Sequence, residues 1–267
     1  MLESGVLEFF SSIPDSSILD FLLFFLIPAL AAAINSVAGG GTFLTFPVFI
    51  MSGLSPLSAN VMSTIALWPG TISSGYGYRK YLATDLRRLL PLFLICVAGG
   101  IAGSLTLLYT PEIFFRRLVP WLLLGATLLF TFGKHVVSFT HQHFPNSKTS
   151  NNLTFLVQFV IAFYGGYFGA GIGILMLAML QLMGLSDIHQ MNALKVLLAA
   201  AINAATVVIF VLAGAVIWKL AAIMVAGGIF GGYVGARLAL KVPPNYVRAL
   251  VSAIGFFMAA YFFMQAA

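Results

Sequence analysis

Residues 153–183 read LTFLVQFVIAFYGGYFGAGIGILMLAMLQLM, a predominantly apolar stretch with five glycines between Gly165 and Gly173. A helix that spans a bilayer needs about 20 residues, so this stretch is too long for one straight crossing. Glycine destabilises a helix interior by about 1 kcal/mol relative to alanine. The glycine cluster therefore predicts a break near the middle, with a short helix on each side.

A second long stretch, residues 18–52, has the same design. Its predicted break is Asn35-Ser36-Val37-Ala38-Gly39-Gly40-Gly41-Thr42, where three consecutive glycines precede a threonine. Six shorter apolar segments each fit a single crossing: 57–76, 89–109, 118–138, 190–213, 217–240 and 246–265. The expected fold class is all-α, a polytopic transmembrane helical bundle.

The composition indicates that lipid is the solvent. Hydrophobic residues make up 61% of the 267-residue chain and charged residues 7%, with a mean hydropathy of +1.04. A soluble domain carries about 25% charged residues. The acids lie in the N-terminal tail, at segment edges or in short connections: Glu3, Glu8, Asp15, Asp20, Asp85, Glu112 and Asp187. The net charge of +6 is not clustered on one face, so it does not indicate nucleic-acid binding.

The two halves of the chain repeat each other at offsets of 128 to 132 residues. The matches are Gly53-Leu54-Ser55 with Gly184-Leu185-Ser186, Val97–Gly103 with Val225–Gly231, Asn60 with Asn192, Pro111 with Pro243, and Arg116 with Arg248. We therefore divide the chain into an N-terminal tail (1–17), a first transmembrane repeat (18–138), a polar linker (139–152) and a second transmembrane repeat (153–267).

The Lys and Arg residues of the connections favour one of two topologies. If each long segment crosses once, they divide seven against five, which is no bias. If each long segment turns at its glycines and returns, only Arg116, Arg117 and Lys219 oppose nine others, as the positive-inside rule expects: Arg79, Lys80, Arg87, Arg88, Lys134, Lys148, Arg237, Lys241 and Arg248. Each half then has three net crossings, so the halves form two inverted repeats, an architecture common in transporters.

Each glycine-rich break is a candidate anion site. Backbone N–H groups freed inside a membrane need a partner, and a helix N-terminus presents them with a partial positive charge. Inverted halves would aim two such helix ends at one central point. The candidate residues are Asn35, Ser36, Gly39, Gly40, Gly41 and Thr42 in the first break, and Gly169, Gly171 and Gly173 in the second. The alternative is close helix packing, which small residues allow.

Lys195 is the cation that lies well inside an apolar segment. An ionisable residue there predicts a functional role, although its place about one turn from the helix start also lets its ammonium reach the interface. Asn192 shares its helix face, and the equivalent positions of the first half are Asn60 and Ser63. These four residues complete the candidate substrate site.

Three further features are given structural roles. Pro69 and Gly70 predict a kink in the segment 57–76. The patterns Gly99-x3-Gly103 and Gly227-x3-Gly231-x3-Gly235 are typical of close helix packing. Cys96 is the single cysteine, which excludes an intramolecular disulfide and a cysteine metal cluster.

Together these residues resemble the sulfite exporter TauE/SafE family of membrane transporters, over nearly the whole chain from about residue 24. The most specific part is Tyr164–Gly173. The other stretches that carry the resemblance are Ala38–Gly41 followed by Pro47, Gly53–Ser55, Asn192–Lys195, and Gly231–Arg237 followed by Pro243-Pro244. The resemblance implies export of a small sulfur-containing anion, sulfite or an organosulfonate, across the bacterial inner membrane.

The charge of such a substrate bears on the direction of transport. A potential that is negative inside drives an anion outward, with about 2.3 kcal/mol per charge per 100 mV. Uptake would need a coupling ion, and the sequence has no Asp, Glu or His well inside a segment to carry a proton. A sodium site built of backbone carbonyls stays open. We expect export by alternating access, with an anion channel or a transporter of another small anion as the alternative.

Other functional classes fit the sequence less well. Catalysis inside a membrane needs acid–base or metal-binding side chains that the segments do not supply, so we do not expect an enzyme. A cationic substrate would lack a carboxylate partner. We expect no cofactor and no metal. The expected partners are the small anionic substrate and membrane lipid, without nucleic acid, and a second copy of the chain is a candidate partner in a homodimer.

Overall fold

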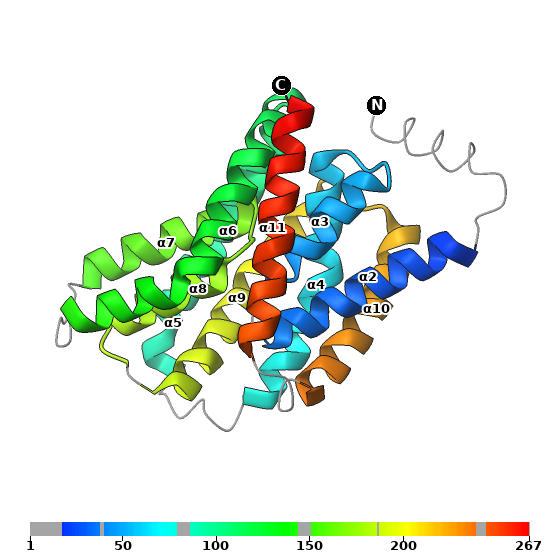
Figure 1. Cartoon of the computed structure of the whole chain (residues 1–267). Coiled ribbons are helices and arrows are strands. Elements are labelled where there is room, and N and C mark those ends of the chain that lie inside the picture. Colours follow the sequence, from blue (N-terminus) through cyan, green and yellow to red (C-terminus); the bar gives the residue numbers. More distant parts are fainter. Residues whose placement is uncertain are drawn as a thin grey trace.

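The computed structural model describes residues 18–37, 40–78, 86–143, 151–185, 187–238 and 244–266. All regular structure within these residues is helical (Figure 1), which confirms the expected all-α class. The helices are α2 (Ile18–Val37), α3 (Thr42–Met51), α4 (Pro56–Tyr78), α5 (Leu86–Tyr109), α6 (Glu112–His143), α7 (Asn151–Tyr167), α8 (Ile172–Leu182), α9 (Ile188–Leu212), α10 (Trp218–Leu238) and α11 (Pro244–Ala266).

Both expected breaks are present. The first long stretch forms α2 and α3, and Gly40 between them has a φ of 93°. The second forms α7 and α8, with Gly169 and Gly171 at φ values of 79° and 78°. Glycine enters this left-handed region without a steric penalty, which lets the chain turn. The Tyr164 hydroxyl donates a 2.8 Å hydrogen bond to the Ala170 carbonyl and ties the second break to α7.

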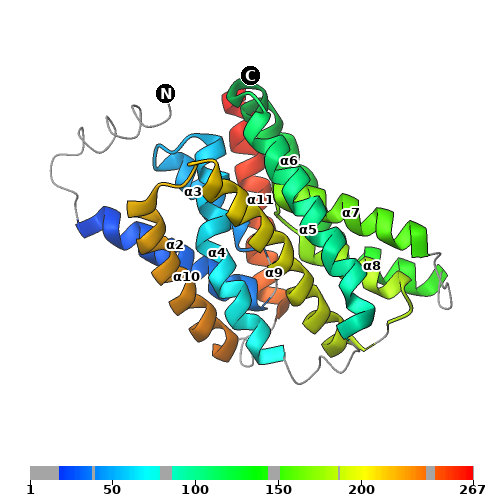
Figure 2. The ribbon, with the colours of Figure 1, turned by 180° about the vertical axis from the view of Figure 1, so that it is seen from behind.

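Each broken pair folds back on itself. The rings of Phe24, near the start of α2, and Phe49, near the end of α3, lie 5.9 Å apart, so α3 returns along α2. In the second pair, Ile172 of α8 faces Gly165 of α7, and both helices share one buried cluster. The α2–α3 and α7–α8 pairs lie at opposite sides of the molecule in both views (Figures 1 and 2).

The matching Gly-Leu-Ser stretches begin with the same kind of turn. Gly53 follows α3 with a φ of 90°, and Gly184 follows α8 with a φ of 87°. The N–H of the next residue donates to the carbonyl five residues earlier, at 3.0 Å after α3 and 3.3 Å after α8. This Schellman motif satisfies the last carbonyls of a helix. At these positions the sequence repeat is also a structural repeat.

The two halves exchange helices. Helix α10 packs against α2 and α4 of the first half, and the equivalent α5 packs against α7 and α9 of the second. Glycines make both contacts possible. A side chain at Gly231 would overlap the Ala29 carbonyl of α2, and one at Gly103 would overlap the Phe163 carbonyl of α7. The packing role expected for the Gly-xxx-Gly patterns is confirmed.

Equivalent helices α6 and α11 pack antiparallel between the halves. The rings of Trp121 and Phe263 lie 4.9 Å apart, and about three turns along α6 the Thr131 hydroxyl donates a 2.8 Å hydrogen bond to Ser252. Equivalent helices run in opposite directions in an inverted repeat. The orientation of the halves in a membrane stays a prediction.

Equivalent helices α4 and α9 also pack antiparallel. The Trp68 indole donates a 3.3 Å hydrogen bond to the Ala200 carbonyl, and Gly75 further along α4 faces Val196. Trp68 and Ala200 are 132 residues apart, the same offset that pairs Asn60 with Asn192. The two helices therefore cross at equivalent positions of the repeat. Helix α4 runs through Pro69 without interruption.

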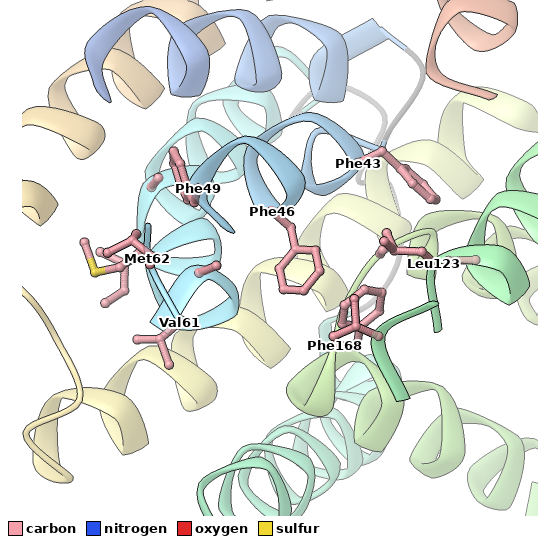
Figure 3. Packing of buried hydrophobic residues seen from close by; sticks show 14 of the residues in the cluster. Phe43, Phe46, Phe49, Val61, Met62, Leu123 and Phe168 are labelled. Atoms are coloured by element: carbon pink, nitrogen blue, oxygen red, sulfur yellow. The ribbon is translucent and has the colours of Figure 1, made fainter. Parts of the chain in front are cut away.

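Phenylalanine side chains fill the core around the start of α3. Phe46 meets Phe168 of the second break edge to face, with ring centroids 5.2 Å apart, and Figure 3 shows Phe46 directed toward Phe168. The Phe43 ring lies 5.5 Å from that of Phe130 on α6. Such aromatic pairs stabilise by about 0.5–1.5 kcal/mol beyond the area that they bury. They hold α3 against both α6 and the second break.

The outer surface is apolar. Leu22, Leu26 and Leu30 form an exposed stripe on α2, and Leu156 and Val160 do the same on α7. Large exposed apolar faces are unusual on a soluble monomer. Five helices of the described residues are long and apolar enough to cross a membrane, through Leu89–Tyr109, Glu112–Gly133, His189–Leu212, Trp218–Gly235 and Tyr246–Gln265.

Candidate functional site

Both glycine breaks reach the same part of α6. Gly40, just before α3, lies against the Phe130 ring, and Gly171, just before α8, lies near the Ala126 carbonyl. Gly133, about one turn beyond Phe130, packs against Ile174 of α8. Positions three and four apart share one face of a helix. The starts of α3 and α8 therefore lie close together along α6.

These two helix starts have glycine N-caps. Gly41 precedes α3 and Gly171 precedes α8, and neither provides a side-chain hydrogen bond to the first turn. Helix α9 differs, because the Asp187 carboxylate accepts a 2.8 Å hydrogen bond from the His189 N–H. First-turn N–H groups carry the positive end of the helix dipole and attract anions. In both breaks backbone carbonyls take part of that role: Phe43 donates to the Gly40 carbonyl at 3.0 Å, and Ile174 donates to the Gly171 carbonyl at 3.1 Å. The positive end of each helix dipole still lies at the break.

Lys195 reaches the start of α8. Its ammonium donates a 2.9 Å hydrogen bond to the side-chain oxygen of Asn192, one turn earlier on α9. Its aliphatic stem passes Gly173, where an added methyl group would come within 3.3 Å of the lysine Cδ. The structure thus brings together three of the residues that the sequence proposed for the site, one from α8 and two from α9.

Arg248 of α11 is a residue that sequence analysis did not single out. Its guanidinium donates a 3.2 Å hydrogen bond to the Phe130 carbonyl and lies 5.4 Å from the centre of the Phe130 ring. Its counterpart Arg116 has a side chain that is 71% exposed and pairs with Glu112 at 3.9 Å. The repeat in the sequence could have indicated this residue. Arg116 has an acid four residues earlier, Glu112, whereas the equivalent position before Arg248 is Pro244.

Lys195 and Arg248 lie around neighbouring residues. Lys195 passes Gly173 of α8, and the next residue, Ile174, packs against Gly133 of α6, one turn from the Phe130 that holds Arg248. Neither cation forms an ion pair with an acid among the residues that the structure describes. Like charges repel more strongly away from bulk water. An anion between the two side chains would offset this repulsion.

Asn60 and Ser63 lie on α4, at the other side of the second break. Asn60 is 2% exposed and Ser63 is 1% exposed. The Asn60 amide donates a 3.0 Å hydrogen bond to the carbonyl of Tyr167, the last residue of α7. The Asn60 Oδ1 and the Ser63 Oγ have no hydrogen-bond partner among the described residues. These two oxygens are buried polar groups available to a ligand.

The remaining proposed residues are Asn35, Ser36, Gly39 and Thr42. Asn35 lies beside Gly41, and Thr42 is the first residue of α3, so both belong to the first break. Ser36 lies at the contact between α2 and α10, where its hydroxyl is 3.0 Å from the Ala32 carbonyl and 3.5 Å from the Gly232 carbonyl. Gly39 is outside the described residues.

The apolar surface and the long apolar helices define an integral membrane protein, and the paired broken helices are typical of membrane transporters. Residues 24–262 match the family described as Sulfite exporter TauE/SafE, and the chain belongs to this family. It is therefore a membrane transporter by family.

Curated relatives carry the same general description. A "Probable membrane transporter protein" of Haemophilus influenzae is 27% identical over 89% of this chain and 92% of its own length. The "Probable membrane transporter protein ORF9" of Sinorhizobium sp is 29% identical over 86% and 88%. The "Probable membrane transporter protein YfcA" of Escherichia coli is 26% identical over 95% and 93%. No solved structure matches the chain.

Proposed function

We propose that this transporter exports a small sulfur-containing oxyanion, sulfite or an organosulfonate, across the bacterial inner membrane by alternating access. The observation that carries the proposal is the pair Lys195 and Arg248, two cations with no described acidic partner: Lys195 lies beside Gly173 of α8, and Arg248 lies beside Phe130 of α6. Two positive charges favour an oxyanion with two negative charges. The family description supports the sulfur-containing class.

In this proposal the anion binds where the starts of α3 and α8 meet α6. The guanidinium of Arg248, held by the Phe130 carbonyl and ring, offers a planar fork to two oxygens of a sulfonate or sulfite group. Lys195 supplies a second, more flexible cation from α9. The positive end of the α8 dipole, after Gly171, completes the positive surroundings.

Alternating access would come from movement of one half against the other. Because α5 and α10 are exchanged, each moving body would combine helices of both halves: α10 would move with α2 and α4, and α5 with α7 and α9. The α6–α11 and α4–α9 contacts would then be the surfaces that slide. A dianion leaving a negative interior gains about 4.6 kcal/mol per 100 mV, twice the value for one charge. Export of such a substrate needs no coupled ion.

The test is sulfite efflux from proteoliposomes that hold the full-length protein and an imposed negative interior. We expect saturable efflux from the wild type and a loss of roughly tenfold or more for Lys195→Ala, since a hydrogen bond to a charged group contributes about 1.5–3 kcal/mol. Lys219→Ala is the matched control, because Lys219 is exposed at the start of α10.

Each outcome decides a separate part of the proposal. Equal efflux from the wild type and Lys195→Ala would remove Lys195 from the path of the anion. Flux that does not saturate would favour a channel over a carrier. Absence of sulfite flux above empty liposomes would overturn the substrate, and other small anions would then be compared in the same vesicles.

A further inference from the structure

We propose that the protein also binds a monovalent alkali cation, for which sodium is the probe, at Asn60 and Ser63 of α4 beside the end of α7. This site is separate from the anion site at the start of α8. The two lie at opposite ends of the short turn 168–171, which joins the last residue of α7 to the first of α8.

The first observation is a pair of buried oxygens. The Asn60 Oδ1 and the Ser63 Oγ are three residues apart on α4, so they share one helix face. Both residues are almost fully buried, at 2% and 1% exposure, and both oxygens are without a described hydrogen-bond partner. A buried polar atom without a partner costs about 1–3 kcal/mol. A bound cation would remove that cost at both atoms.

The hydrogen bond of Asn60 fixes which of its atoms faces the site. The amide nitrogen must donate to reach the Tyr167 carbonyl at 3.0 Å. The other atom of the amide is then the oxygen, which can only accept. An anion is a poor partner for this oxygen, whereas a cation or a water molecule suits it.

The end of α7 adds a favourable electrostatic field. Tyr167 is the last residue of α7, and the C-terminal end of a helix carries a partial negative charge. Broken helices in transporters bind coupling cations at such ends and anionic substrates at helix starts. The break between α7 and α8 offers both in one short stretch, a negative end at Tyr167 and a positive start at Ile172.

The type of ligand atom indicates the charge of the cation. The amide, hydroxyl and carbonyl oxygens here are neutral, and no described carboxylate takes part. Calcium and magnesium sites use carboxylate ligands to balance two positive charges. Neutral oxygens alone favour an ion with a single charge.

The second repeat supports the same conclusion independently. Asn192 is equivalent to Asn60, and Lys195 is equivalent to Ser63. In the second repeat the Lys195 ammonium donates to the Asn192 Oδ1 at 2.9 Å. In the first repeat the same asparagine oxygen has no described donor, because serine stands where lysine would be. A free alkali cation would bind the Asn60 Oδ1 as the Lys195 ammonium binds the Asn192 Oδ1.

The experiment measures thermal unfolding of the purified full chain in detergent. Sodium chloride or potassium chloride replaces N-methyl-D-glucamine chloride at constant ionic strength, so chloride stays fixed and no sulfur anion is present. We expect the unfolding temperature of the wild type to rise saturably with sodium, because a ligand that binds only the folded state stabilises it. A rise with potassium as well would support an alkali-cation site of low selectivity.

Two variants test the location of the cation. Ser63→Lys supplies a tethered ammonium, as in the second repeat, and should abolish the response to sodium. Asn60→Asp keeps the shape and adds a negative charge, and should lower the half-saturating sodium concentration by roughly five- to tenfold. Ser104→Ala is the control and should respond like the wild type, because the buried Ser104 hydroxyl already donates to Ile101 at 3.0 Å.

Three results would overturn the site. The first is a wild-type unfolding temperature that does not distinguish the alkali chlorides from N-methyl-D-glucamine chloride, which would mean that water satisfies the two oxygens. The second is an unchanged sodium response in both Asn60→Asp and Ser63→Lys. The third is an unchanged half-saturating concentration in Asn60→Asp where Ser63→Lys does not fold. The assay contains no transport substrate, so failure of the sulfur-anion proposal would leave these readings intact.

Discussion

Replacing Arg248 with glutamine removes one of the two cations at the candidate anion site. The side chain is held by a hydrogen bond to the Phe130 carbonyl and by the Phe130 ring, so its position does not depend on a bound anion. Glutamine is shorter and neutral, and it cannot form the bidentate fork of a guanidinium. We expect Arg248→Gln to weaken anion binding and to weaken it most for a doubly charged anion.

The magnitude follows from the interaction that is lost. A hydrogen bond between charged groups contributes about 1.5–3 kcal/mol, which is roughly a 10- to 100-fold change in Kd. The assay is isothermal titration of the protein in lipid nanodiscs with sulfoacetate, a dianion, and methanesulfonate, a monoanion. The preference for the dianion should fall by roughly tenfold in Arg248→Gln, because Lys195 alone balances one charge. Arg248→Lys keeps the positive charge and loses the bidentate fork. Its preference for the dianion should lie between those of the wild type and Arg248→Gln.

Arg116→Gln is the matched control, since it removes the equivalent arginine of the first half. Arg116 is exposed and its contact with Glu112 is a surface pair, which contributes little to stability. Anion binding by this variant should equal that of the wild type. The reasoning would be refuted by Arg248→Gln binding both sulfonates like the wild type, or by an equal loss in Arg116→Gln.

Two further predictions concern glycines. Gly171→Ala and Gly184→Ala each force alanine into a left-handed conformation without a steric overlap: the added methyl group would lie 3.5 Å from the Ala126 carbonyl at position 171 and would meet nothing within 4 Å at position 184. Each should destabilise the protein by about 1–2 kcal/mol. Only Gly171→Ala should also weaken sulfonate binding by titration, and an equal effect of Gly184→Ala would remove the start of α8 from the site. Gly231→Ala, which would overlap the Ala29 carbonyl, should lower stability by about 1–3 kcal/mol in thermal unfolding. A methyl group added at Gly125 would meet nothing within 4 Å, so Gly125→Ala should raise stability by up to about 1 kcal/mol. A loss of stability in Gly125→Ala equal to that in Gly231→Ala would contradict the packing argument.

Much of the fold could be predicted because glycine acts locally. The breaks at Gly40 and Gly169 have a positive φ, and a glycine in an otherwise apolar stretch predicts such a break from the sequence alone. The close contacts at Gly103 and Gly231 follow from spacing on one helix face. The exchange of α5 and α10 between the halves was not predictable in this way. It depends on which of several small-residue faces pack together, and a glycine pattern does not name its partner.

The candidate site was predictable only in part, for a similar reason. Lys195 is conspicuous because it interrupts an apolar segment, and the structure places it beside Gly173 as well as Asn192. Arg248 stands near the start of its helix, where an arginine is usually solvated at the membrane surface. Its inward position comes from Phe130, more than one hundred residues earlier in the chain. Tertiary contacts of this kind leave no periodicity in the sequence to reveal them.

The two glycine breaks repeat, but the charges beside them do not. Two glycine-capped helix starts come from equivalent breaks, yet both inward cations, Lys195 and Arg248, belong to the second half. The first half has Ser63 and the outward Arg116 at the same repeat positions. A lysine in place of the buried Ser63 would add a third inward cation to Lys195 and Arg248, and repulsion between like charges grows in a low-dielectric interior. Keeping neutral oxygens in the first half limits the positive charge at the anion site and leaves Asn60 free to accept a cation.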